Sequence, residues 1–181
     1  GISEAKLAEY NKGSNLYNRA ISGTYAPGST FKMVVATAAL ETGTITTQTR
    51  INDTGVYPRG YHPTCWYYTQ YHYGHGYLNI TDAIKKSCNY FFYELGYRMG
   101  IDPVIQYAKS YGLGRKTGIE LSGESQGTVD LKEACKNQTG QEWQFGDTLS
   151  AVIGQSYNNY TPIQMARYIS MIANGGKKVD V

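Results

Sequence analysis

The sequence predicts an α+β domain in which helices predominate. The chain has 181 residues, 41% of them hydrophobic, with 21 glycines and 5 prolines, a composition typical of a globular protein. That length fits one domain or part of a larger one. Helix start and stop signals recur along the chain, and only residues 143–153 resemble a segment that leads into a strand.

The charge pattern argues against a nucleic-acid-binding protein. The net charge is only +3, and the basic pairs at 85–86, 115–116 and 177–178 are scattered, whereas nucleic-acid-binding proteins gather such residues on one face. No run approaches the roughly 18 apolar residues of a membrane span. We therefore expect any membrane anchor to lie outside this chain.

Three cysteines, Cys65, Cys88 and Cys135, cannot all pair within the chain. Their wide spacing matches no small disulfide scaffold. At least one thiol must therefore be free, oxidised elsewhere or bound to a metal.

The N-terminal third predicts two helices of different character. A helix is expected near Ser3 to Tyr10 in a polar opening segment. A second helix, over about Ser29 to Glu41, follows Pro27 and is ended by Gly43 in the manner of a C-terminal cap. Because this second helix is apolar on nearly every side, we expect it in the centre of the fold.

The middle of the chain predicts a long irregular segment at residues 44–78, which is rich in Gly, Tyr, His and Thr. Long loops in compact domains usually carry function or need a staple. Thr81 and Asp82 can cap a short helix to Lys86. Further helices are expected at Asn89–Met99, from Asp102-Pro103 toward Tyr111, and from Thr161-Pro162 to Ala173.

Ser29 and Lys32, in "YAPGSTFK", form an S-x-x-K pair at the start of the apolar helix. In the first turn, the helix dipole stabilises negative charge developing on the serine oxygen. Lys32 lies one turn on, and burial should lower its pKa and supply a neutral amine as a base. In the plainer alternative, Ser29 only caps the helix and Lys32 extends to the surface.

Ser87 and Asn89, in "KKSCNYFFYELG", provide a second polar element between two helical segments. A turn there points both side chains the same way, giving a hydroxyl for proton relay and an amide for holding a substrate carbonyl. S-x-x-K together with S-D-N and K-T-G is the motif set of penicillin-binding proteins and class A β-lactamases.

Four segments carry a specific resemblance: "YAPGSTFK", "GHGYLNITDAIKKSCNYFFYELGYRMGID", "GRKTGIELSGE" and "IGQSYNNYTPIQMARYISMIANGG". Together they resemble the transpeptidase domain of class B penicillin-binding proteins, in particular the elongation-type, cell-shape branch. The resemblance implies a helical half packed against a mainly antiparallel sheet, here incomplete. It also implies Ser29 as nucleophile, Lys32 as its base, and Ser87 with Asn89 as the S-x-N motif.

A K-T-G triplet occurs at residues 116–118, between the second motif and "TPIQMA". In the family, the catalytic K-T-G lies on a strand after that helix, so we interpret residues 116–118 as a structural turn in the family's "TGIEL" connector. We expect this chain to be a partial transpeptidase domain over residues 1–181, truncated before the catalytic K-T-G strand. The isolated fragment is then expected to be inactive, since that strand helps to form the oxyanion hole.

The irregular segment and the second motif also hold a set of potential zinc ligands: Asp53, His62, Cys65, His72, His75 and Cys88. Structural zinc sites close with four Cys, His or carboxylate ligands. From spacing alone the alternative is favoured, in which Cys88 is a core residue, Cys65 a thiol or disulfide partner, and the histidines are solvated. No C-x-x-C pair is present.

The resemblance shifts this balance, because elongation-type members can carry zinc on the His of G-H-G and the Cys of S-C-N, here His75 and Cys88. Asp53 and Cys65 are our choices to complete the set, with His62 or His72 as substitutes. We expect such a zinc to be structural, tying the 44–78 insertion to the catalytic turn.

The function that the resemblance implies is peptidoglycan D,D-transpeptidation at the outer face of the bacterial cytoplasmic membrane. Ser29 would attack a stem peptide between two D-alanines, and a neighbouring amine would resolve the acyl-enzyme. Gly154 and Gln155 match a signature near the substrate, where the backbone is the expected contributor. The implied partners are stem peptides, β-lactams and the cell-wall elongation machinery. A serine β-lactamase, a penicillin-sensing receptor domain and a structural zinc module remain as alternatives.

Overall fold

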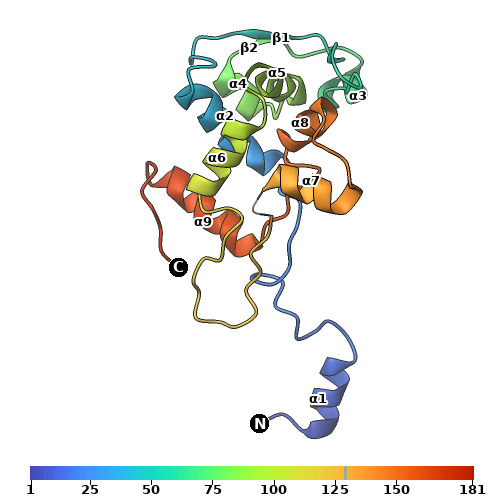
Figure 1. The fold of residues 1–181 in the computed structure, drawn as a ribbon, viewed down its shortest axis with the longest axis vertical. Helices are drawn as coiled ribbons and strands as arrows, with labels where there is room; N and C mark the ends of the chain where they lie inside the picture. Colours follow the sequence, from blue (N-terminus) through green and yellow to red (C-terminus); the bar gives the residue numbers. More distant parts are fainter. Residues whose placement is uncertain (129) are drawn as a thin grey trace.

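The computed structural model describes residues 1–128 and 130–181. Helices predominate in it, as the sequence predicts (Figure 1). The elements in chain order are α1 (Glu4–Asn11), the 3-10 turn η1 (Gly28–Phe31), α2 (Lys32–Glu41), β1 (Ile51–Asp53), α3 (Trp66–Tyr71), β2 (Gly76–Leu78), α4 (Ile80–Lys85), α5 (Asn89–Met99), α6 (Asp102–Ser110), α7 (Leu131–Thr139), α8 (Phe145–Ala151) and α9 (Pro162–Ala173).

Helix α2 lies in the core, which confirms its predicted central place. It packs against α5 and α6, and the side chains of Val34, Val35, Ala38 and Ala39 are fully buried. Burial of several aliphatic side chains, each worth roughly 1.5–3 kcal/mol for the larger ones, makes this helix a rigid base for whatever its first turn carries. Gly43 follows its end with φ of 69°, in the left-handed conformation expected of a glycine cap.

The 44–78 segment is more ordered than predicted. Residues 51–53 pair antiparallel with residues 76–78, with Ile51 opposite Leu78. Helix α3 lies between the two strands in the sequence. The prediction of an irregular segment is wrong at these elements. Strands of three residues are too short to show an alternating pattern, so the pairing depends on contacts distant in sequence. In Figure 1 this pair crosses the end of the molecule above α5.

The short helix α4 begins two residues earlier than predicted. Its N-cap is Asn79, whose side chain accepts a hydrogen bond from the Asp82 backbone N–H. Asparagine is among the best capping residues, and a start at residue 80 also buries Ile80. Thr81 and Asp82 therefore lie inside the helix instead of capping it.

Residues 143–153 do not lead into a strand, which corrects that prediction. They form helix α8, opened by a reciprocal capping box in which Gln144 and Asp147 satisfy each other's backbone N–H groups. The helix packs on α5. Helix α7, capped by Asp130, was not predicted either. Both helices have seven to nine residues, too few for the hydrophobic period to stand out.

Helix α1 begins after Ser3, as predicted, but buries no residue. Figure 1 shows it standing away from the other helices, joined to them by a long segment of turns and loops. Across the described residues, every helix is too short or too polar to cross a bilayer.

Candidate active site

Ser29 lies in the 3-10 turn η1, directly before α2, and not in the first turn of an α-helix as predicted. Two side-chain hydroxyls donate hydrogen bonds to backbone carbonyls near Ser29. Thr30 Oγ1 donates to Pro27 O at 2.6 Å, and Tyr168 Oη donates to Thr30 O at 2.8 Å. Ser29 is exposed, whereas the next residue but one, Phe31, is fully buried. The Ser29 hydroxyl is thus accessible, and the backbone that carries it is anchored in the core.

Lys32 is the first residue of α2, and its side chain is only 2% exposed. Its Nζ donates to Ser87 O at 2.8 Å, to Ser87 Oγ at 3.0 Å and to Asn89 Oδ1 at 2.7 Å. In the described part of the chain it forms no ion pair with a carboxylate. Burial lowers the pKa of Lys32 to about 8, although Cys88 and Cys65 act to raise it. The amine is therefore buried, as the sequence predicts.

The link from Lys32 to Ser29 is indirect. Ser87 Oγ lies within hydrogen-bond distance of both, at 3.0 Å from Lys32 Nζ and 3.0 Å from Ser29 Oγ. Among the described residues no direct hydrogen bond joins Lys32 to Ser29. The prediction that the lysine reaches the serine hydroxyl itself is corrected to a contact through the second motif.

Ser87 has a strained backbone, with φ of 50° in the left-handed region. Such a conformation is uncommon for a residue with a Cβ and is concentrated at functional sites. The turn at Ser87 ends α4. Its backbone closes back on the helix, because the Cys88 N–H donates to Ala83 O at 2.9 Å and the Ser87 N–H donates to Ile84 O at 3.0 Å. The reversal turns Ser87 and Asn89 toward the same amine, as predicted.

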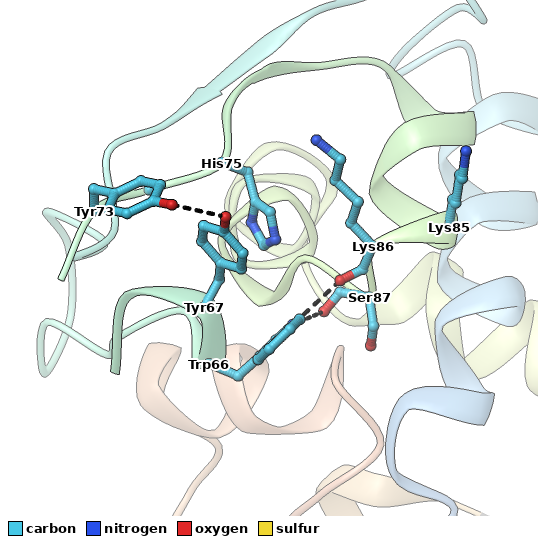
Figure 2. Close-up of a pocket in the computed structure, with 8 residues that line it drawn as sticks. Trp66, Tyr67, Tyr73, His75, Lys85, Lys86 and Ser87 are labelled. Carbon is cyan, nitrogen blue, oxygen red and sulfur yellow. Dashed lines mark hydrogen bonds between the residues drawn. The ribbon is translucent and has the colours of Figure 1, made fainter. Parts of the chain in front are cut away.

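Trp66 contacts this turn and was not predicted. Its Nε1 donates to Ser87 O at 3.0 Å and to Lys86 O at 3.2 Å (Figure 2). Ser87 O therefore accepts from both the indole and the Lys32 amine. Nothing in the sequence around Trp66 signals this role, apart from its position next to Cys65.

Gly154 and Gln155 lie beside the first motif. The Gly28 N–H donates to Gly154 O at 2.9 Å, and a Cβ on Gly154 would collide with the Gly28 carbonyl. Because φ of Gly154 is 74°, only glycine fits this approach without strain. Gln155 is exposed. The backbone proximity expected at this position is present.

The K-T-G triplet at 116–118 lies in the loop between α6 and α7, far from α4 in Figure 1. Thr117 N and Oγ1 both donate to Glu124 Oε1 at 2.6 Å, and the Gly118 N–H donates to Glu124 Oε2 at 3.2 Å. The donors of the triplet are thus used in hydrogen bonds to the buried Glu124 carboxylate. Residues 116–118 thus form a structural turn, as we interpreted them.

Asp53, Cys65, His75 and Cys88 come together in one buried cluster. Each offers a ligand atom, and these atoms all lie within 4.8 Å of one another. The four residues come from β1, the N-cap of α3, the residue before β2 and the N-cap of α5. His62 and His72 are exposed and lie outside the cluster. Within the described residues no cysteine is in a disulfide.

The separations in the cluster fit a small tetrahedral ion. Cys65 Sγ lies 4.0 Å from Cys88 Sγ and 3.7 Å from His75 Nδ1, against about 3.8 Å and about 3.6 Å for ligands on one tetrahedral zinc. Asp53 Oδ2 lies 3.3 Å from Cys88 Sγ and 2.7 Å from His75 Nδ1. Ligands on one tetrahedral zinc would be about 3.6 Å apart for the first of these two pairs and about 3.3 Å apart for the second, so both pairs are closer here than a shared zinc would hold them.

The cluster gathers negative charge. Burial opposes ionisation of Asp53, but hydrogen bonds from His75, the Gly55 N–H and Cys88 outweigh it and lower the pKa of the Asp53 carboxyl. The contact between the Cys65 and Cys88 sulfur atoms, 4.0 Å apart, lowers the pKa of Cys65 to about 6 and raises the pKa of Cys88. A carboxylate and a thiolate then share a site from which water is excluded, which favours a divalent cation.

Comparisons with known proteins agree with this geometry. Residues 3–181 match the family described as the penicillin binding protein transpeptidase domain. The chain is 38% identical over 167 residues to the peptidoglycan D,D-transpeptidase MrdA of Acinetobacter baumannii, covering 91% of this chain and 24% of that protein. The chain thus spans about a quarter of the curated relatives it matches.

Two solved structures are similar in fold. Pseudomonas aeruginosa PBP2, in complex with WCK 5153, has a TM-score of 0.89 at 35% identity, covering 99% of this chain and 40% of that one. The complex of PBP2 and MreC from Helicobacter pylori has a TM-score of 0.85 at 33% identity, and the match covers 97% of this chain and 33% of that one. These similarities confirm the predicted fold class.

Proposed function

Because the chain belongs to the penicillin-binding protein transpeptidase family, we propose that it carries the acylated serine of a peptidoglycan D,D-transpeptidase. The observation that carries the proposal is the line of contacts from a buried amine through Ser87 to an exposed Ser29 hydroxyl. The relatives named MrdA and PBP2 support the same reaction class.

Lys32 is the proposed base, and its hydrogen bonds suit both of its protonation states. As an ammonium it donates to all three oxygen partners. As a neutral amine it has two N–H donors and one lone pair. Ser87 O and Asn89 Oδ1 only accept, so the lone pair is left for the Ser87 hydroxyl proton.

The proposed proton route follows from this arrangement. When Ser29 Oγ attacks the carbonyl between two D-alanines, its proton passes to Ser87 Oγ, and the Ser87 proton passes to Lys32 Nζ. The C–N bond to the terminal D-alanine breaks as the proton returns to that nitrogen by the same route. General acid–base transfer of this kind contributes typically 10²–10⁴-fold in rate.

We assign Asn89 to orientation of both base and substrate. Its Oδ1 holds Lys32 Nζ at 2.7 Å, and its amide nitrogen would donate to a substrate carbonyl. Gly154 and Gln155 are assigned to the substrate-binding edge, because the Gly154 backbone lies against Gly28, next to the nucleophile.

The test is acylation, by a labelled penicillin, of the full-length protein that contains these 181 residues. Wild type should be labelled at Ser29, and Ser29→Ala should not. Equal labelling of the two proteins would overturn the assignment.

We further propose that Asp53, Cys65, His75 and Cys88 hold a structural zinc ion. The donor set, its burial and its separations support this. When bound, zinc would supply a crosslink between the 44–78 segment and the residue between Ser87 and Asn89. Elemental analysis of protein purified without chelator tests it, and absence of metal would overturn it.

The partners and place of action are proposed by relation to the similar proteins. A PBP2 solved with MreC supports participation in cell-wall elongation machinery. The penicillin G acyl-enzyme complex of penicillin-binding protein A from M. tuberculosis, 27% identical to this chain, supports binding of β-lactams. Because the proposed reaction is peptidoglycan crosslinking, we assign the site to the outer face of the bacterial cytoplasmic membrane.

A further inference from the structure

A pocket of about 460 Å³ opens beside the catalytic turn and is not used by the mechanism above. Figure 2 shows the side chains that surround it. Its lining residues are Trp66, Tyr67, Tyr73, Gly74, His75, Lys85, Lys86 and Ser87. Ser87 is thus both a wall of this pocket and the neighbour of Ser29, at 3.0 Å between hydroxyl oxygens.

One side of the pocket is a set of fixed aromatic rings. Tyr67 stacks on His75 with ring centroids 4.2 Å apart, and Tyr67 Oη donates to Tyr73 Oη at 3.3 Å. Trp66 is held by its bonds to the turn yet remains 41% exposed. Tyr73 is 59% exposed. Exposed rings held in place in this way offer flat apolar surface to a ligand at little entropic cost.

The opposite side of the pocket is cationic. Lys85 and Lys86 are exposed at the C-terminal end of α4. In the described part of the chain, neither forms an ion pair. Figure 2 shows the Lys86 side chain passing beside the His75 ring, across the pocket from Tyr73. The pocket therefore combines aromatic faces with the unpaired ammonium group of Lys86, while Lys85 extends away from the rings and adds positive charge at the end of α4.

We propose that this pocket binds the acceptor of the crosslinking reaction, an acidic peptide that carries the attacking amine. The inference rests on the proposed function, which requires a second peptide beside the acylated serine. Carboxylates of the acceptor would lie against Lys86, with Lys85 adding positive charge nearby, and its aliphatic chain would lie against Trp66 and Tyr73. The pocket's border with Ser87 brings the amine to the acyl group.

The transfer step balances with the residues present. The acceptor nitrogen bonds to the acyl carbon, the bond from that carbon to Ser29 Oγ breaks, and a proton from the amine passes through Ser87 to restore the Ser29 hydroxyl. A ligand in the pocket would contact Trp66, and Trp66 and Lys32 both donate to Ser87 O, so the ligand is linked to the proposed base through this carbonyl.

The experiment compares two double charge reversals in the full-length protein that contains this chain. Lys85→Glu/Lys86→Glu changes the pocket, and Lys177→Glu/Lys178→Glu makes the same change at an exposed pair beyond α9, away from α3 and α4 in Figure 1. Two rates are measured: acylation by labelled penicillin, which needs no acceptor, and transfer of an acyl group from a thioester donor to a tripeptide. The tripeptide ends in diaminopimelate, or in lysine, which lacks the second carboxylate.

The pocket reversal should raise the acceptor KM for the diaminopimelate peptide about tenfold at low salt, as two reversed exposed charge contacts would. Penicillin acylation should change less than about twofold. Wild type should have a lower KM for the diaminopimelate peptide than for the lysine peptide, and this difference should disappear in the variant. Tyr73→Ala should also raise the acceptor KM, without any change of charge.

An acceptor KM equal to that of the 177–178 control would overturn the proposal, as would a parallel loss of penicillin acylation, which would make the pocket a support for the turn. Failure of wild type to be acylated at Ser29 would instead overturn the proposed function. The two failures are therefore distinguishable.

Discussion

The two halves of the candidate site are held in place differently. The first motif stands at the start of α2, a helix whose aliphatic side chains are buried on several sides. The second motif stands on a strained turn, where Ser87 has φ of 50°. That turn is held by Trp66 and by the cluster containing Cys88, both of which reach it from the 44–78 segment. In the proposed mechanism, the reacting groups therefore belong to short motifs, whereas the position of the second motif depends on a segment distant in sequence.

The largest effect should follow from breaking the first half. Lys32→Met keeps a long apolar side chain in the buried position but removes the base, so acylation by penicillin should fall about 10³-fold with the fold preserved. Stopped-flow acylation and circular dichroism measure the two quantities. Wild-type acylation by a folded Lys32→Met protein would contradict the assignment of the base.

A smaller effect should follow from releasing the second half. Cys88→Ser removes a proposed zinc ligand and should lower metal content and slow acylation about 10- to 100-fold. The matched control is Cys135→Ser, which changes a buried cysteine in α7, outside the cluster. Metal content and acylation rate are measured on both. If the two variants retain equal metal, Cys88 is not a ligand.

A change of pH alters the protonation of Lys32, the residue of the first motif that contacts Ser87 and Asn89 in the second. Burial disfavours the ammonium and lowers the pKa of Lys32 to about 8, so the neutral, active form gains as pH rises. Acylation should increase about tenfold per pH unit below pH 8 and level off above it. Metal content is checked at each pH. A rate that is flat between pH 6 and 8 would contradict a base that titrates in this range.

The smallest effect should come from the K-T-G triplet at 116–118. Lys116→Ala should change acylation less than about twofold, because the triplet is a turn bonded to Glu124 and surface substitutions away from special features are nearly neutral. The same acylation assay measures it. A fall of more than tenfold in the acylation rate would show that the triplet takes part in catalysis.

Local signals predicted much of the molecule. An apolar helix with a proline before it and a glycine after it predicted α2, and Asp102-Pro103 and Thr161-Pro162 marked the starts of α6 and α9. The motif residues Ser29, Lys32, Ser87 and Asn89 do converge, and Cys65, His75 and Asp53 do join Cys88. Their catalytic and metal-binding roles stay predictions.

The remainder depends on contacts between distant residues. Residues 145–151 form a helix because Gln144 and Asp147 cap it and α5 accepts it, a combination that outweighs a weak strand pattern. The proton route through Ser87 could not be predicted from an S-x-x-K spacing, since it depends on a left-handed residue 55 positions away. Trp66 likewise bonds a carbonyl 21 residues on.

The central claim is that a buried, uncharged amine at Lys32 serves as the base for Ser29. Titration of lysine Cε resonances by NMR in ¹³C-lysine-labelled protein tests it most directly. One lysine should titrate near pH 8, and its signal should be missing from Lys32→Met. Titration of every lysine near the ordinary value of about 10.4 would contradict the account.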